Sequence, residues 1–284
     1  MLIVSDVDGT LIDGTGRAPC SSSLLQDGMQ RIARAHGAAC SVALASSRTL
    51  HELVVLQRAL GLVGACIAED GAILAVDESE VTGVWTESPN RSHIKVGRRS
   101  LVVWTLGDPA DHLRTELGSV IAPHELDPSD TVHMAMLGFR SRGTVRRAIN
   151  ERRASVLLDL HGNDRLPAVR EAASRAQAHL HSGGRWHTLT RGAGKGHATD
   201  ALRRLLTAQR RATLRIVGIG NEENDATLLA SADIAFAIRN AKGGIHPDLA
   251  AVPGAHTLGM IGTAGFVEML DRLADMPIFD EATR

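Results

Sequence analysis

Short apolar runs alternate with amphipathic segments at both ends of this sequence, and that alternation limits the available folds more than any other feature. Short continuous apolar runs are typical of strands buried on both faces of a parallel sheet. In the N-terminal part, strands are expected over residues 2–5, 41–45 and in "ACIAEDGAIL", with helices over 21–36 and 49–60. In the C-terminal part, helices and strands alternate in the segments "GKGHATDALRRLLTAQ", "TLRIVGIG", "NDATLLASA", "DIAFAI" and "TAGFVEMLDRLA". Short connections favour right-handed crossovers, so the sequence predicts an α/β fold with a doubly wound parallel sheet.

The middle of the chain, residues 81–187, has a different pattern. Alternating stretches such as "SLVVWTL", "TVHMAMLGF" and "SVLLDLH" indicate strands, and helical spacing is expected over residues 110–116, 144–152 and 167–179. This pattern predicts an α+β module inserted into the α/β core. The core then comprises residues 1–80 and 188–284, with connections near residues 83–92 and 182–194 as hinges.

Composition and charge do not favour several classes of function. The formal net charge is −1, and aromatic residues are limited to three Trp and four Phe, which does not favour a nucleic-acid or anionic-membrane partner. The three cysteines, Cys20, Cys40 and Cys66, lack paired metal spacing and suggest reduced thiols. We expect no signal peptide, because the first residues are apolar and acidic without a basic stretch, and no apolar run reaches the length of a membrane helix. We therefore expect a cytoplasmic protein that acts on a small molecule, as a monomer or weak homodimer.

Polar clusters follow or adjoin the predicted strands of the core. They are "DVDGT" at 6–10, "SSR" at 46–48, "GKG" at 194–196 and "GNEEND" at 220–225. Singly, each has an ordinary structural explanation, as a turn or calcium loop, a helix cap, a solvated lysine, or acids beside a helix start. Because ligands bind at the carboxyl ends of strands in doubly wound sheets, all four together favour one functional site.

This set of side chains suits phosphoryl transfer through a carboxylate nucleophile. One Asp would attack phosphorus and form an aspartyl-phosphate, and a second would protonate the leaving oxygen and then activate water. A hydroxyl and a lysine would hold the phosphoryl oxygens, while further oxygen ligands would hold Mg²⁺.

The order "DVDGTL … SSR … K … GxGxxxxD" resembles the haloacid dehalogenase (HAD) superfamily of phosphatases, and the position of the insert resembles the C2-type cap of the Cof-like sugar-phosphate phosphatases. The resemblance implies a nucleophile at Asp6 and a general acid/base at Asp8. It implies phosphate binding by Ser46 and Lys195. It also implies that Mg²⁺ is the cofactor, with the ligands Asp6, Asp8 (through its carbonyl), Asn221 and Asp225.

Within this group, the chain is similar to the mannosyl-3-phosphoglycerate phosphatase family in "SSRTLHELVVLQRALGL", "IAEDGAIL", "ERRAS" and "GGRWHTLTRGAGKGHA". This likeness implies a phosphorylated sugar or glycosyl acid as substrate. The substrate-binding residues expected with it are Ser47, Arg48, Arg152, Ser155, Arg185 and His187.

Two departures leave alternatives open. Asn221 replaces the acidic metal ligand expected there, which predicts weaker Mg²⁺ binding unless Glu222 or Glu223 substitutes for it. Val156 and Leu157 replace the Glu-Pro pair of the cap motif, which leaves the substrate open. A Cof-like phosphatase of other specificity, a mutase, and a sugar-phosphate-binding protein without turnover are the alternatives.

Overall fold

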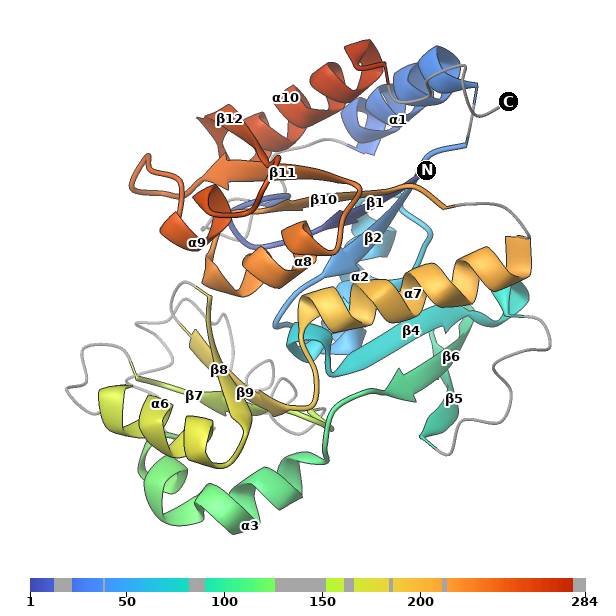
Figure 1. Ribbon diagram of the computed structural model, residues 1–284. Coiled ribbons are helices and arrows are strands. Elements are labelled where there is room, and N and C mark those ends of the chain that lie inside the picture. Colours follow the sequence, from blue (N-terminus) through green and yellow to red (C-terminus); the bar gives the residue numbers. More distant parts are fainter. Residues whose placement is uncertain are drawn as a thin grey trace.

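The computed structural model describes residues 1–12, 22–37, 39–81, 90–125, 152–160, 166–183, 186–210 and 214–277. Its main feature is a nine-stranded sheet in the order β12-β11-β10-β1-β2-β3-β4-β6-β5 (Figure 1). The strands are β1 (Leu2–Ser5), β2 (Ser41–Ala45), β3 (Cys66–Ala68), β4 (Ile73–Asp77), β5 (Arg91–Val96), β6 (Arg99–Thr105), β10 (Ile216–Gly220), β11 (Ile234–Arg239) and β12 (His256–Ile261).

The parallel part of this sheet confirms the predicted fold class. The strands from β12 through β3 pair in parallel, with β1 between β10 and β2. The helices of this unit are α1 (Ser22–His36), α2 (Leu50–Ala59), α7 (Lys195–Arg210), α8 (Ala226–Ala230), α9 (Pro247–Ala250) and α10 (Gly262–Asp275).

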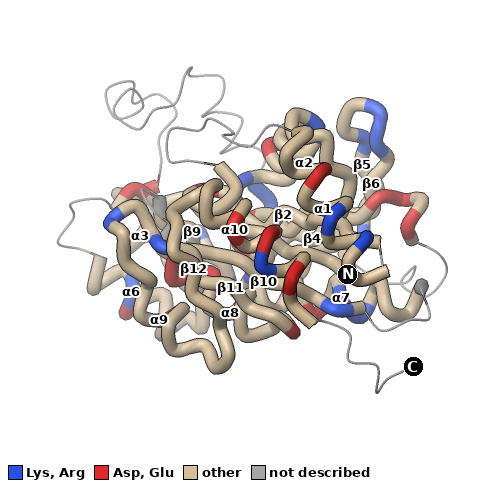
Figure 2. Tube along the Cα trace, turned by 90° about the horizontal axis from the view of Figure 1, so that it is seen from above, with Lys and Arg blue, Asp and Glu red and all other residues tan. Residues whose placement is uncertain are grey.

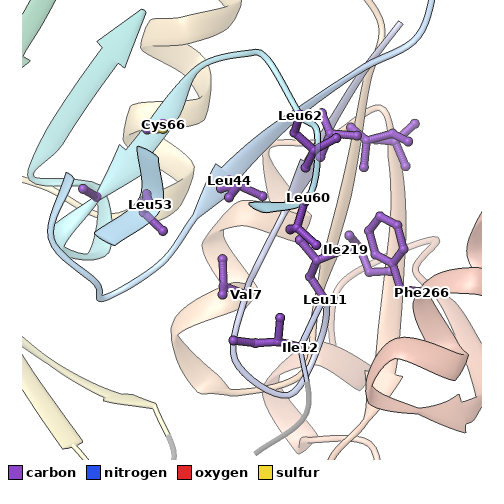
Figure 3. Packing of buried hydrophobic residues seen from close by; sticks show 14 of the residues in the cluster. Val7, Leu11, Ile12, Leu44, Leu53, Leu60, Leu62, Cys66, Ile219 and Phe266 are labelled. Carbon is purple, nitrogen blue, oxygen red and sulfur yellow. The ribbon is translucent and has the colours of Figure 1, made fainter. Parts of the chain in front are cut away.

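The two faces of the sheet carry separate hydrophobic cores. One core joins strand residues to α1, α2 and α10, and Figure 3 shows part of it, from Val7 and Leu11 to Phe266. The other core lies under α7 and includes Leu202 and Leu205. Alternate residues of β1 enter the two cores, Ile3 the first and Val4 the second, which explains why its apolar run is continuous.

The predicted boundary of the insert at residue 81 is wrong for residues 91–105. Strands β5 and β6 pair antiparallel onto β4 and extend the main sheet. In β6, Leu101 and Val103 enter the first core, whereas Val102 and Trp104 enter the second. Strand β6 therefore buries both of its faces as a continuation of the sheet, whereas β5 forms the more exposed edge.

In the part of the insert that the structure describes, a separate antiparallel sheet in the order β7-β9-β8 packs with two helices. The elements of this part are α3 (Ala110–Ile121), β7 (Val156–Leu158), α6 (Leu166–Arg175), β8 (Ala178–Gly183) and β9 (Trp186–Arg191). A third core joins these helices to the small sheet through residues such as Leu113, Val169 and Leu189. The predicted boundary between residues 187 and 188 falls inside β9, which pairs with β8 along its length and with β7 at residues 187–189.

Two helix boundaries in the insert also differ from expectation. Helix α3 continues to Ile121 because Leu117 and Ile121 are buried on its apolar face. Helix α6 ends at Arg175, and Gln177, at φ 54°, turns the chain into β8, so His179 is in a strand. The helix expected over residues 144–152 and the stretch "TVHMAMLGF" lie outside the described residues, apart from Arg152.

The distribution of charge fits the near-zero net charge. Segments of Lys and Arg are interleaved with segments of Asp and Glu in the described parts of the chain (Figure 2). None of the described helices is both long enough and apolar enough to cross a membrane.

Candidate active site

The turn after β1 places the first two aspartates at the carboxyl end of the central strand. The backbone N–H of Asp6 donates to the Ile219 carbonyl at 3.0 Å, which continues the pairing with β10. Gly9 then adopts a φ of 81°, and a Cβ on it would lie 2.6 Å from Nδ2 of Asn221. Only glycine fits this turn, since it supplies the positive φ and leaves space for Asn221.

A buried lysine lies between two carboxylates. Nζ of Lys195, at the start of α7, donates to Asp6 Oδ1 at 2.7 Å and to Asp225 Oδ1 at 2.6 Å. The three side chains are between 0% and 8% exposed. Burial, together with repulsion from Asp225, raises the pKa of Asp6 to about 7 in spite of the lysine. Burial alone would lower the pKa of Lys195, but Asp225 and Asp6 raise it above its ordinary value.

Asp225 also organises the loop after β10. Its Oδ2 accepts from the backbone N–H groups of Asn221 at 2.9 Å and Glu222 at 3.1 Å. A Cβ on Gly220 would lie 2.3 Å from Cβ of Asp225, so this approach requires glycine. Both oxygens of Asp225, which the sequence predicts as a metal ligand, are thus occupied by Lys195 and the loop.

The amide of Asn221 fills a point where three oxygens converge. In the orientation that satisfies its hydrogen bonds, the amide nitrogen donates to Thr10 Oγ1 at 3.0 Å, Asp6 Oδ2 at 3.1 Å and the Asp8 carbonyl at 3.2 Å. In the opposite orientation, the amide oxygen takes that place and accepts from the Thr10 hydroxyl at 3.0 Å. That oxygen then faces the oxygens of Asp6 and Asp8, an arrangement that a cation would stabilise.

These oxygen atoms are of the kind that binds Mg²⁺, but together they supply little negative charge. A carboxylate, a carbonyl and an amide oxygen form the oxygen-only set that Mg²⁺ prefers. Asp6 is the only charged member, and it already pairs with Lys195. Among the described residues, no group of three His, Cys, Asp or Glu side chains is placed to hold a metal. The two other candidates have different partners, because Glu222 accepts from the backbone of Asp225 and Glu223 lies 3.7 Å from Arg170.

The residues after β2 bring a hydroxyl and an arginine to the same edge. Ser46 is buried, with its backbone N–H paired to the carbonyl of Ile67 at 2.9 Å. The guanidinium of Arg48 binds Asp8 through two hydrogen bonds, from Nε to Oδ2 at 2.8 Å and from Nη2 to Oδ1 at 2.6 Å. Arg48 therefore contacts the second aspartate in this structure, whereas the sequence places it with the substrate.

Glu69 is an important residue that the sequence prediction missed. It follows β3 in a turn at φ 53° and is 1% exposed. Its carboxylate accepts from the Arg153 N–H at 3.0 Å, the Ala154 N–H at 3.0 Å and the Ser155 hydroxyl at 2.7 Å. An acidic residue directly after a buried strand is the signal that singled out the other clusters, and "AED" shares it.

Arg152 and Ser155, predicted to bind substrate, help to join the insert to the core. Arg152 donates to Ser155 Oγ at 2.9 Å and to the Ser47 carbonyl at 2.9 Å. The Ser155 hydroxyl is fully buried against Glu69. His187 is buried in β9, opposite Leu158 and Ser182, and Arg185 lies outside the described residues.

A cleft of about 720 Å³ lies between the insert and the core, at the loop of residues 192–194 that leads into α7. It is lined by α6, by β8 and by residues just before and at the start of α7 and α8. The lining includes Arg170, His179, His181, His197, Glu223 and Asn224. The Asn224 amide donates to Asp70 Oδ1 at 2.9 Å, and Oδ2 of Asp70 has no hydrogen-bond partner among the described residues. Burial lowers the pKa of His181 in this wall.

Comparison with known proteins supports the fold. No protein-family model matches the chain. In structure it is similar to a Thermoplasma acidophilum protein, with a TM-score of 0.63, 16% identity, and coverage of 97% of this chain and 98% of that one. It is similar to a protein of Bacteroides thetaiotaomicron described among phosphatases of the haloalkanoate (HAD) superfamily, with a TM-score of 0.62, 14% identity, and coverage of 97% and 95%.

A sugar phosphatase of HAD subclass IIB is similar over 97% of this chain and 99% of its own, with a TM-score of 0.61 and 14% identity. The α/β core with an inserted antiparallel sheet is thus the fold of HAD subclass IIB structures. At these identities the similarity establishes the fold alone, because activity depends on the residues of the site.

Proposed function

We propose that this protein is a Mg²⁺-dependent phosphomonoesterase that hydrolyses a phosphorylated sugar through an aspartyl-phosphate on Asp6. The observation that carries the proposal is the buried Lys195 between Asp6 and Asp225, with Asp8 two residues beyond Asp6. A turn or a calcium loop would not need a buried cation at this point. The solved phosphatases with the same fold are consistent with this chemistry.

The residues account for both halves of the reaction. A carboxylate oxygen of Asp6 attacks phosphorus, the bond from phosphorus to the leaving oxygen breaks, and Asp8 gives that oxygen a proton. Water then attacks the phosphorus of the aspartyl-phosphate, and Asp8 takes up a proton from this water. Inorganic phosphate leaves and Asp6 is a carboxylate again. Lys195 and Ser46 hold phosphoryl oxygens and offset their charge.

The metal would be held by the Asp6 carboxylate, the Asp8 carbonyl and the Asn221 amide oxygen. When bound, Mg²⁺ neutralises the charge that gathers when a phosphate dianion approaches a carboxylate. Asn221 must turn its amide to present oxygen, and in doing so gives up its hydrogen bonds to Asp6 and Asp8. We therefore expect Mg²⁺ binding to be weak.

A sugar phosphate is the substrate class we propose, and mannosyl-3-phosphoglycerate is a narrower candidate within it. The sugar phosphatase with the same fold supports the class. The narrower candidate depends on Arg152, Ser155 and Arg185, of which the first two use their side chains to join the insert to the core. The cleft between the insert and the core offers amide, imidazole and guanidinium groups of the kind that bind hydroxyls.

Phosphate release tests this function. The protein is incubated with Mg²⁺ and a panel of hexose phosphates, pentose phosphates and mannosyl-3-phosphoglycerate, with Asp6→Asn as the matched control. We expect release from at least one sugar phosphate and none with Asp6→Asn. Release that survives Asp6→Asn would refute the nucleophile, and binding of a sugar phosphate without any release would indicate a binding protein instead.

A further inference from the structure

The salt bridge between Arg48 and Asp8 gives the arginine a role beyond binding substrate. Both oxygens of Asp8 accept hydrogen bonds from Arg48, at 2.8 Å and 2.6 Å, and the side chains are 30% and 49% exposed. Two parallel hydrogen bonds fix the plane of a carboxylate as well as its position. A single bond, or a lysine, leaves that plane free to turn.

Hydrogen bonds hold the backbone of Arg48 in place, so its side chain extends toward Asp8 from a fixed position. Its N–H donates to Ser46 Oγ at 3.3 Å, and its carbonyl accepts from the Glu69 N–H at 3.0 Å. Glu69 in turn holds the insert through the backbone of Arg153 and Ala154. From the insert, Arg152 donates to the carbonyl of Ser47, the residue before Arg48.

The surroundings distinguish this ion pair from ordinary surface pairs. Arg31 and Asp271 form one at 2.6 Å between α1 and α10, with side chains 48% and 52% exposed, and neither has a part in the proposed chemistry. Exposed pairs of that kind contribute little to stability. Arg48 instead reaches from the strand end that carries Ser46 to the acid/base of the neighbouring strand end.

We infer that Arg48 is a positioning residue for Asp8, which it aims at the leaving oxygen and at the hydrolytic water. This inference rests on the proposed function. The carboxylate form that accepts both hydrogen bonds is the form needed to take a proton from water. To give a proton to the leaving oxygen, Asp8 must release one of the two bonds, and the other keeps its orientation.

The test separates positioning from a direct contact with phosphate. In kcat/KM, which covers the steps up to formation of the aspartyl-phosphate, a sugar alkoxide needs a proton to leave, whereas p-nitrophenolate does not. For Arg48→Ala we expect kcat/KM to fall about 10–100-fold on the sugar phosphate, and less than about 3-fold on p-nitrophenyl phosphate. Arg48→Lys should recover part of the loss.

A double-mutant cycle completes the experiment. In an Asp8→Asn background, Arg48→Ala should change kcat/KM on the sugar phosphate by less than about 3-fold, because the group that it positions is already inactive. Arg31→Ala is the matched control and should leave kcat/KM unchanged on both substrates. Melting temperatures of all variants identify any loss due to unfolding.

Each outcome decides a separate question. Equal losses on both substrates, or additive losses in the cycle, would overturn the inference while leaving the phosphatase intact. A fall in kcat/KM that is the same on both substrates and is accompanied by a lower melting temperature would show that the salt bridge is merely structural. Absence of turnover of either substrate by the wild type would overturn the proposed function, and this inference with it.

Discussion

Replacing Asn221 with aspartate should convert a weak Mg²⁺ site into a stronger one and destabilise the metal-free protein. The side chain lies at the convergence of Thr10 Oγ1, Asp6 Oδ2 and the Asp8 carbonyl. Asn221→Asp keeps the shape of the side chain but removes the N–H donor. It also adds a charge beside Asp6.

The separations give the size of the effect. At an effective dielectric constant of 20, two like charges 3.1 Å apart, the Asp6–Asn221 distance, repel by about 5 kcal/mol. Lys195 at 2.7 Å from Asp6 offsets part of this repulsion. We expect the free energy of unfolding without Mg²⁺ to fall by about 2–4 kcal/mol at pH 8, lost hydrogen bonds included. A cation between the carboxylates removes the repulsion, and we expect the Kd for Mg²⁺ to tighten about 10–100-fold, or about 1.4–2.7 kcal/mol.

Calorimetric titration with Mg²⁺ and urea unfolding with and without Mg²⁺ measure these quantities directly. Asn240→Asp is the matched control, because Asn240 makes its own hydrogen bond to the Lys242 N–H away from the site. The control should leave the Kd for Mg²⁺ unchanged. If Asn221→Asp has the Kd of the wild type within twofold, residue 221 is not a ligand. Tight Mg²⁺ binding by the wild type would contradict the reasoning from charge.

Other expected outcomes concern the core, the turn and pH. Glu69→Ala leaves two backbone N–H groups and a hydroxyl without their acceptor, so the free energy of unfolding measured in urea should fall by about 2–5 kcal/mol. The control Glu171→Ala, at an exposed position, should lower it by less than about 0.5 kcal/mol. Gly9→Ala introduces a Cβ 2.6 Å from Asn221 at a φ of 81°, and should lower the melting temperature and weaken Mg²⁺ binding; unchanged values would refute the packing argument. Because the folded pKa of Asp6 is raised from 3.8 to about 7, the folded protein keeps a proton that the unfolded chain loses. The free energy of unfolding without Mg²⁺ should therefore fall as pH rises through this window, by roughly 2–4 kcal/mol, and Asp6→Asn should flatten that dependence.

The sequence predicted the parallel core well because its signals are local. The apolar runs that give β1 and β2 end at the predicted residues, and each is followed by a helix with its own apolar face. Thr49 caps α2 together with Glu52, which explains why the helix begins where expected. Such patterns depend only on residues that are close in sequence, so they can be identified before the three-dimensional structure is known.

The features that the sequence did not predict depend on distant partners. Gln57 interrupts the apolar side of α2, yet it is buried because its amide donates to Gly64 and Ala65 and accepts from Arg99, 42 positions away. The addition of β5 and β6 to the main sheet depends on pairing with β4.

The same limit applies at the candidate site. Polar residues at strand ends marked Asp6, Asp8, Ser46, Lys195 and Asp225, and the structure brings Lys195 to both Asp6 and Asp225. Glu69 has the same strand-end position, but its role could not be predicted because its partners lie 84 to 86 positions away. Roles assigned to Arg152 and Ser155 by resemblance remain predictions, and their side chains serve the contact between insert and core.

The most direct test of the central claim is to trap phosphate on Asp6. Asp8→Asn is mixed with Mg²⁺ and p-nitrophenyl phosphate, whose leaving group needs no proton from Asp8, then quenched in acid and digested for mass spectrometry. Because this variant lacks the base that activates water, the peptide containing Asp6 should gain the mass of one phosphoryl group, and Asp6→Asn should not. A wild type that releases phosphate while no quenched sample carries phosphate on Asp6 would contradict the aspartyl-phosphate mechanism.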